Sequence, residues 1–136
     1  MSLELQPVYN DMVRMFTTST NASRFTYDFV AAFNNVMDEF YAQGVIDTAP
    51  THVDAAGATS DDVGSRLLAF IKVGLAYHLI LLGQKHAGME LTNAKSLWDE
   101  ALGKAMVVES REDMSTVDSD GVPTDDIAGL GYTGDL

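Results

Sequence analysis

The sequence predicts an all-α protein: a small four-helix bundle-like domain followed by a long extended C-terminal arm. Four segments place apolar residues three and four positions apart, the period of a helix buried along one face. The chain of 136 residues is long enough for one domain with its own core, which we place at residues 1–106. Residues 107–136 lack this period and are interrupted by helix-breaking residues: Gly121, Pro123, Gly129, Gly131 and Gly134.

The first predicted helix covers residues 7–16. Pro7 suits the first turn of a helix, where its missing N–H has no partner to lose. Val8, Met12, Met15 and Phe16 then recur at helical spacing.

The second predicted helix begins after Asn21 or Ser23, either of which can cap it, and ends at Gly44 in the left-handed conformation. Residues 24–28 alternate in polarity and could be extended, but the aromatic residues continue at a spacing of four, which favours a helix. The apolar stripe of this helix consists of Phe29, Phe33, Val36, Met37, Phe40 and Tyr41.

Residues 45–59 have the composition of a long loop, a kind of segment that is often functional. Ser60, Asp61 and Asp62 then offer an N-cap and negative charge for a third helix over residues 63–82.

The third helix is apolar on every side, which indicates burial in protein or in lipid. Its apolar part, residues 67–82, is shorter than the roughly 20 residues that span a bilayer. Because four helices can hardly surround one of their number, we expect part of its surface to contact another subunit. The predicted contact residues are Leu68, Lys72, Tyr77 and His78. Gly74 in mid-helix predicts the close approach of a neighbouring backbone.

The fourth predicted helix begins at Met89 or Glu90 and ends at Met106. Lys95 and Lys104 can pair with acids four residues away, Asp99 and Glu100. Its predicted core face consists of Leu91, Ala94, Leu97, Trp98, Ala101, Leu102, Ala105 and Met106.

The charge of the chain is concentrated in the arm. Twenty acidic residues against eight Lys and Arg give a net charge of −12. Residues 107–136 hold eight of the acids and one base, Arg111, so the arm carries −7 and residues 1–106 carry −5. This balance argues against a nucleic-acid groove or an anionic membrane as the main partner. Only a few apolar residues could anchor the arm to a partner: Val117, Val122, Ile127, Leu130, Tyr132 and Leu136.

We expect no catalytic, cofactor or metal site. The chain has no cysteine, and its three histidines lack the spacing of a metal site. His52 with Asp47 and Asp54 is the one loop cluster that could hold a ligand, and a structural role is the favoured interpretation. Residues 118–121 resemble half of a calcium loop, but Thr116 and Ile127 stand where that loop needs acids.

In helix order, size and arm, the chain resembles the head–tail connector adaptor proteins of tailed bacteriophages. The features that carry the resemblance are a short amphipathic helix, a capped helix ending at Gly44, a long loop containing residues 46–50 (Ile-Asp-Thr-Ala-Pro), a very apolar helix, a helix containing Trp98, and the arm.

The resemblance implies a structural virion protein, made in the host cytoplasm and located at the head–tail junction. Copies of the chain would form a ring of twelve under the portal protein and link the capsid to the tail and stopper proteins. The arm would grip neighbouring subunits, and genome DNA would pass without sequence-specific binding.

A second hypothesis comes from the charge alone: a small acidic inhibitor that mimics DNA and occupies a nucleic-acid-binding enzyme. Such mimicry needs carboxylates at regular spacing on rigid elements. Here the arm, which has no regular period, holds most of the excess negative charge. We therefore favour the assembly protein over the DNA mimic.

Overall fold

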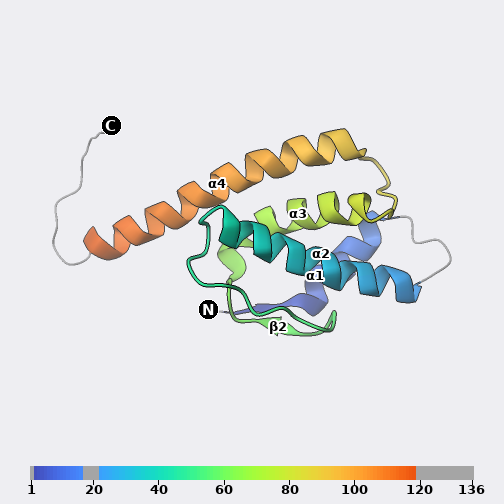
Figure 1. Ribbon diagram of the computed structural model, residues 1–136, viewed down its shortest axis with the longest axis horizontal. Coiled ribbons are helices and arrows are strands. Elements are labelled where there is room, and N and C mark those ends of the chain that lie inside the picture. The colour runs from blue at the N-terminus through green and yellow to red at the C-terminus, as the bar shows by residue number, and fades with distance from the viewer. Residues whose placement is uncertain (1, 17–21, 119–136) are drawn as a thin grey trace. The chain divides into compact units, whose positions relative to one another are not determined.

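A computed structural model describes residues 2–16 and 22–118 of the protein (Figure 1). Residues Met1–Met106, called the body below, form one compact unit. The helices are α1 (Leu5–Met15), α2 (Ala22–Ala42), α3 (Leu68–Leu81) and α4 (Leu91–Asp118), and a short 3-10 helix, Ser65–Leu67, precedes α3. The mostly helical class is therefore confirmed.

A small two-stranded sheet is the part of the fold that the sequence analysis missed. Strand β1 (Leu3–Glu4) pairs antiparallel with β2 (Thr59–Ser60), and the Leu5 amide extends the pairing with a 3.0 Å hydrogen bond to the Ala58 carbonyl. Strands of two residues leave no periodic signal in a sequence. The pairing buries Leu3 and ties the long loop to the start of the chain.

Two glycines end helices in the same way. Gly44 has φ +82° and Gly83 has φ +105°, the left-handed conformation that residues with a Cβ rarely adopt. After α2, the Val45 amide bonds to the Phe40 carbonyl, and after α3, the Gln84 amide bonds to the Leu79 carbonyl. Both are Schellman caps. The predicted role of Gly44 is thus confirmed, and Gly83 has the same role.

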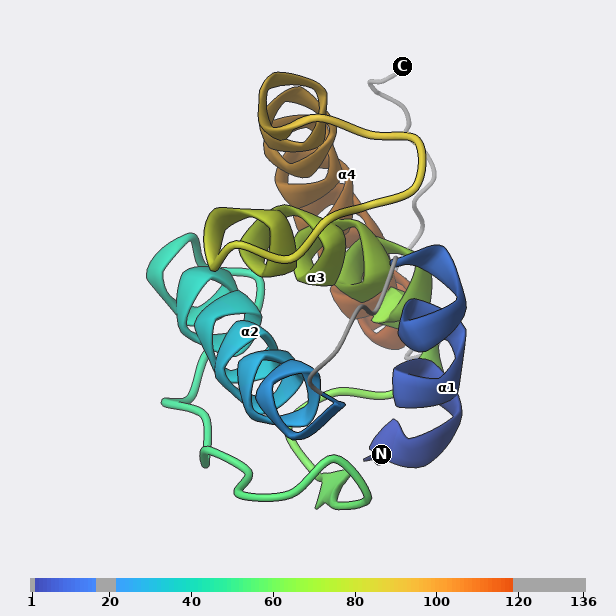
Figure 2. The same cartoon turned by 90° about the vertical axis from the view of Figure 1, so that its right-hand side faces the viewer.

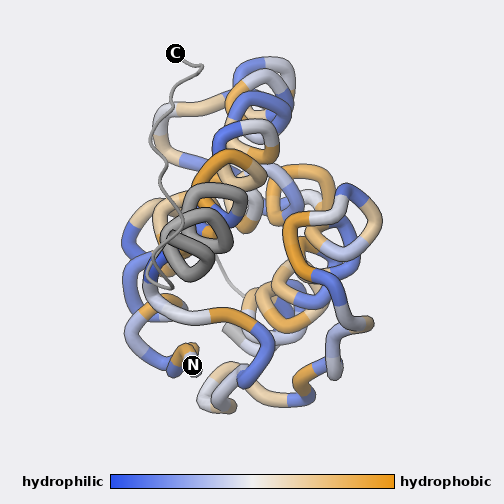
Figure 3. Tube along the Cα trace, turned by 90° about the vertical axis from the view of Figure 1, so that its left-hand side faces the viewer, coloured by the Kyte–Doolittle hydropathy of each residue, from blue (hydrophilic) through white to orange (hydrophobic). Residues whose placement is uncertain are grey.

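The centre of the body is α3, which packs mainly against α2 and also against α1 (Figure 2). Ile71, Leu75 and Leu79 of α3 are fully buried. From α2, the stripe of Phe29, Phe33, Val36, Met37 and Phe40 is buried as predicted, whereas Tyr41 is 47% exposed. Coloured by hydropathy, the helices show hydrophobic positions interspersed with hydrophilic ones (Figure 3).

The predicted start of the third helix at Val63 is wrong, since α3 begins at Leu68. Gly64 is extended and separates the 3-10 turn from the acidic residues before it. Ser60 lies in β2, and the Asp62 carboxylate accepts a hydrogen bond from the Thr51 amide at 2.9 Å. These residues hold the loop rather than cap a helix. At α2, Ser23 lies inside the helix, and Asn21 is outside the described residues.

The predicted end of the fourth helix at Met106 is also wrong, because α4 continues to Asp118. Residues 107–118 contain no glycine or proline, and Glu109, Arg111 and Glu112 all favour helix. The first part of the predicted extended arm is therefore helical, and residues 119–136 lie outside the described part of the chain.

Helix α4 buries a narrower face than the sequence predicts. The buried positions between Leu91 and Met106 are Ala94, Trp98, Ala101 and Ala105. Leu91, Leu97 and Met106 are each more than 40% exposed, against expectation. The predicted ion pairs are confirmed: Lys95 to Asp99 at 3.3 Å and Lys104 to Glu100 at 2.9 Å. Among the helices of the described chain, none is both long and apolar enough to span a membrane.

Candidate functional site

Helices α2, α3 and α4 meet at one carboxylate oxygen. Oε1 of Glu39 accepts a 2.6 Å hydrogen bond from the Trp98 indole N–H and lies 2.7 Å from Nε2 of His78. Trp98 is 1% exposed and His78 is 8% exposed, while the Glu39 side chain is 41% exposed. A buried indole N–H needs an acceptor, and this carboxylate supplies one at the edge of the solvent. We call these three residues the Glu39 junction.

Gly74 makes room for the Trp98 ring. A Cβ built on Gly74 would lie 2.7 Å from the Trp98 ring and 2.8 Å from a methyl of Val36. The close approach that the sequence predicts at Gly74 is therefore real, but the neighbours are side chains of α4 and α2 rather than a backbone. The Trp98 socket, as we call it, is lined by Val36 and Phe40 of α2 and by Gly74 of α3. The ring centroid of Phe40 lies 5.7 Å from that of Trp98.

A second polar contact joins α3 to α1. Nζ of Lys72 donates a 2.8 Å hydrogen bond to Oδ2 of Asp11, and Arg14 contacts the other carboxylate oxygen at 3.2 Å. The hydrogen bond and the positive charge of Lys72 lower the pKa of Asp11 below its ordinary value, and the charge of Arg14 adds to this effect. Lys72 is thus engaged within its own chain.

One face of α3 remains partly exposed. Phe70, Val73, Tyr77 and Ile80 share the side of the helix opposite the buried Ile71 and Leu75, and each is partly exposed. Leu81 at the end of the helix is 53% exposed. We call these five residues the α3 strip. Within the described residues of the body, 2–16 and 23–106, the packing of α1, α2 and α4 leaves this apolar surface incompletely covered.

The structure divides the predicted contact residues into three groups. Tyr77 belongs to the α3 strip, and Leu68 is partly exposed at the start of α3. Lys72 and His78 contact carboxylates of the same chain, and the rings of Tyr77 and His78 lie 4.9 Å apart. Val117 lies in α4, but its side chain is not described. Val122, Ile127, Leu130, Tyr132 and Leu136 lie outside the described residues.

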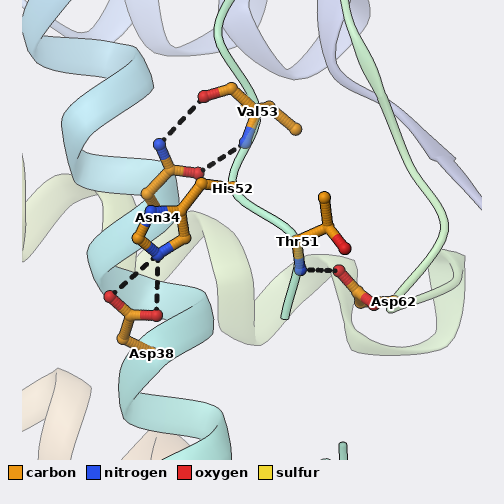
Figure 4. A network of polar contacts seen from close by, with 6 residues as sticks. All are labelled: Asn34, Asp38, Thr51, His52, Val53 and Asp62. Atoms are coloured by element: carbon orange, nitrogen blue, oxygen red, sulfur yellow. Dashed lines mark hydrogen bonds and ion pairs between the residues drawn. The ribbon is translucent and has the colours of Figure 1, made fainter. Parts of the chain in front are cut away.

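The long loop is held against α2 by side-chain hydrogen bonds (Figure 4). The Asn34 amide donates to the Val53 carbonyl at 3.0 Å and accepts from the Val53 N–H at 2.9 Å. Nε2 of His52 lies 2.9 Å from Oδ1 of Asp38. His52 therefore pairs with a helix residue rather than with Asp47 or Asp54.

A shallow hollow of about 270 Å³ lies between the two arms of this loop, lined by Thr51–Asp54 and Ala58–Asp62. Its walls carry hydroxyls and carboxylates. We find no group of three or more His, Asp or Glu side chains that could hold a metal ion in the described part of the chain. The two imidazole–carboxylate pairs serve the fold: one ties α3 to α2, and the other ties the loop to α2.

The role of Glu39 and the exposure of two leucines of α4 were not predicted from the sequence. Glu39 belongs by pattern to the polar side of α2, but it directly precedes the buried Phe40 and so lies at the margin of the apolar stripe. The signal that could have found it is Trp98, because a tryptophan on a core face requires an acceptor for its N–H. The exposure of Leu91 and Leu97 depends on which side of α4 packs against α2 and α3. The local sequence pattern does not determine that side.

Comparison with family models, with curated proteins and with solved structures found no match to this chain.

Proposed function

We propose that this chain is a non-enzymatic assembly protein that joins copies of itself and other proteins through apolar surface on α3 and α4. The observation that carries the proposal is the α3 strip, because a helix this apolar is normally covered on every side. Leu91, Leu97 and Met106 add exposed apolar surface on α4. Exposed apolar residues gathered on one face of a helix are typical of protein–protein contact sites.

The specific form that we propose is a head–tail connector adaptor of a tailed bacteriophage, which the helix order and size of the chain resemble. In this role a ring of copies lies under the portal protein and links the capsid to tail and stopper proteins in the virion. The acidic arm meets neighbouring subunits, and its charge repels the passing DNA rather than binding it.

The use of polar side chains within the body supports a structural role. Carboxylates that could serve in chemistry are occupied in contacts that hold elements together: Glu39 joins three helices, Asp11 joins α1 to α3, and Asp38 holds the loop. These pairs also neutralise carboxylates that a mimic of DNA would present to its target.

The test is assembly with and without the portal protein encoded by the same genome, followed by native mass spectrometry and electron microscopy. We expect a ring on the portal. A chain that stays monomeric both alone and with the portal contradicts the proposal. Capture of a polymerase, nuclease or repressor in place of virion proteins would instead favour the DNA mimic.

A matched pair of variants tests the surface. Leu97→Glu places a charge on an exposed apolar position of α4 and should weaken ring formation. Ser96→Glu adds the same charge at the neighbouring exposed position and should leave ring formation unchanged. Equal behaviour of the two variants would mean that the apolar surface at Leu97 is not a contact site.

A further inference from the structure

The attachment of α4 to the rest of the body depends on one large side chain. Between Leu91 and Met106 the buried residues are Trp98 and three alanines. The most extensive helix contact in the body is between α2 and α3, and Trp98 reaches from α4 to both, against Val36, Phe40 and Gly74. Its indole N–H completes the attachment through Glu39. The Trp98 socket therefore belongs to α2 and α3, and its occupant belongs to α4.

The connection that leads into α4 is firmly anchored up to Ala87. Gln84 donates a 2.9 Å hydrogen bond to the buried carboxylate of Asp28. His86 pairs with Phe16, and the Ala87 amide bonds to the Met15 carbonyl at 3.0 Å. The next three residues, Gly88–Glu90, make no hydrogen bond to α1, α2 or α3 in the described chain. They form a short linker between the anchored loop and α4.

We propose that α4 is exchanged between copies of this chain, so that Trp98 of one copy occupies the socket of the next copy. An exchanged α4 makes the same contacts as a docked one, because both partners have the same sequence. These contacts therefore stabilise the monomer with a docked α4 and the exchanged oligomer equally. The equilibrium between monomer and oligomer is then set by the linker and by protein concentration, and short linkers favour exchange.

Exchange gives the proposed assembly a physical basis, and this inference rests on the proposed function in that respect. If each copy passes its α4 to the next in one direction, the contact is heterologous, and it closes into a ring when the rotation between copies permits. The junction between two copies could then cover Leu91, Leu97 and Met106, which are each more than 40% exposed in the single chain.

The decisive experiment mixes two full-length variants that can restore only each other. Trp98→Ala keeps the socket but lacks the side chain that fills it. Because Trp98 is the single tryptophan of the chain, this variant also has no tryptophan emission. Gly74→Leu keeps Trp98 but fills the socket. We expect each variant alone to be monomeric by light scattering. On mixing, we expect the mass of a two-chain complex and a blue shift of tryptophan emission, as the indole enters the socket of the other chain.

An unchanged mass and an unchanged emission after mixing would overturn the exchange. Circular dichroism of each variant shows whether it is folded. If Gly74→Leu does not fold, deletion of Gly88–Met89 decides the matter, because the shortened linker prevents α4 from folding back. That variant should form oligomers whose tryptophan emission matches the wild type, and a monomer would overturn the proposal.

Failure of the exchange and failure of the proposed function give different results. If the wild-type chain forms a ring on the portal while the mixed variants do not interact, assembly stands and exchange is wrong. If the mixed variants form the two-chain complex while the wild-type chain never joins the portal, exchange stands and the proposed function is wrong.

Discussion

The indole N–H of Trp98 donates a 2.6 Å hydrogen bond to Oε1 of Glu39, the oxygen that also lies 2.7 Å from His78. One carboxylate oxygen therefore serves polar groups from two other helices. Hydrogen bonds to a charged acceptor are stronger than those between neutral groups. The two polar groups that depend on Glu39 are nearly inaccessible to solvent, so the carboxylate decides whether they are satisfied.

Glu39→Ala should lower the free energy of unfolding by about 1–3 kcal/mol, because the buried indole and imidazole lose their acceptor. Glu39→Gln keeps an acceptor oxygen at the same place and should cost less. Urea unfolding followed by circular dichroism measures both variants. Equal midpoints for Ala and Gln would contradict the role assigned to the carboxylate.

Gly74→Ala should destabilise the protein by about 1–3 kcal/mol, the usual cost of overpacking a core. The new methyl would lie within 3 Å of the Trp98 ring and of Val36. Helix propensity alone predicts the opposite sign, a gain of up to about 1 kcal/mol.

Gly103→Ala provides the matched control, since a Cβ at Gly103 in α4 meets no atom within 4 Å. This variant should be stabilised by up to about 1 kcal/mol. A gain of stability in both variants would show that Gly74 is not constrained by packing.

The sequence was informative where local chemistry decides the structure. The stripe from Phe29 to Phe40 and the glycine cap at Gly44 follow from helical period and from the left-handed conformation, and both are confirmed. The ion pair of Lys95 with Asp99 follows from their spacing in the same way.

Features that depend on contacts between distant segments could not be predicted. The pairing of Leu3 with Ser60 joins the two ends of a long stretch of chain, and neither strand has a pattern of its own. Asp38 lies by pattern on the polar side of α2, and its partner His52 comes from a loop distant in the sequence. Likewise, nothing local to Leu97 shows that α4 buries only the side of the helix that carries Trp98 and the alanines.

Lys72→Met should raise the pKa of Asp11 toward its ordinary value, because the hydrogen bond and charge of Lys72 lower that pKa in the wild type. A carboxyl whose pKa is lower in the folded state than in the unfolded state stabilises the protein above the unfolded pKa. This contribution is lost as the pH falls through the folded pKa. The stability difference between wild type and Lys72→Met should therefore be present at neutral pH and disappear in acid.

NMR titration of Asp11 and urea unfolding across the acid range measure these effects. Lys95→Met removes an exposed ion pair with Asp99 and serves as the control, since it should leave the pKa of Asp11 unchanged. An Asp11 titration that is the same in wild type and Lys72→Met would contradict the assignment.

Asn34→Ala should release the loop from α2, because this one side chain satisfies both the N–H and the carbonyl of Val53. The loss of two partly buried hydrogen bonds should cost about 1–3 kcal/mol. Hydrogen exchange at the Val53 amide should become faster, while the core amides of α3 keep their protection at a pH and temperature where local opening dominates. Asn35→Ala changes the adjacent exposed residue and should leave the Val53 amide protected. If Val53 exchanges equally fast in both variants, the loop is held by the His52–Asp38 pair and by the strand pairing at Thr59 rather than by Asn34.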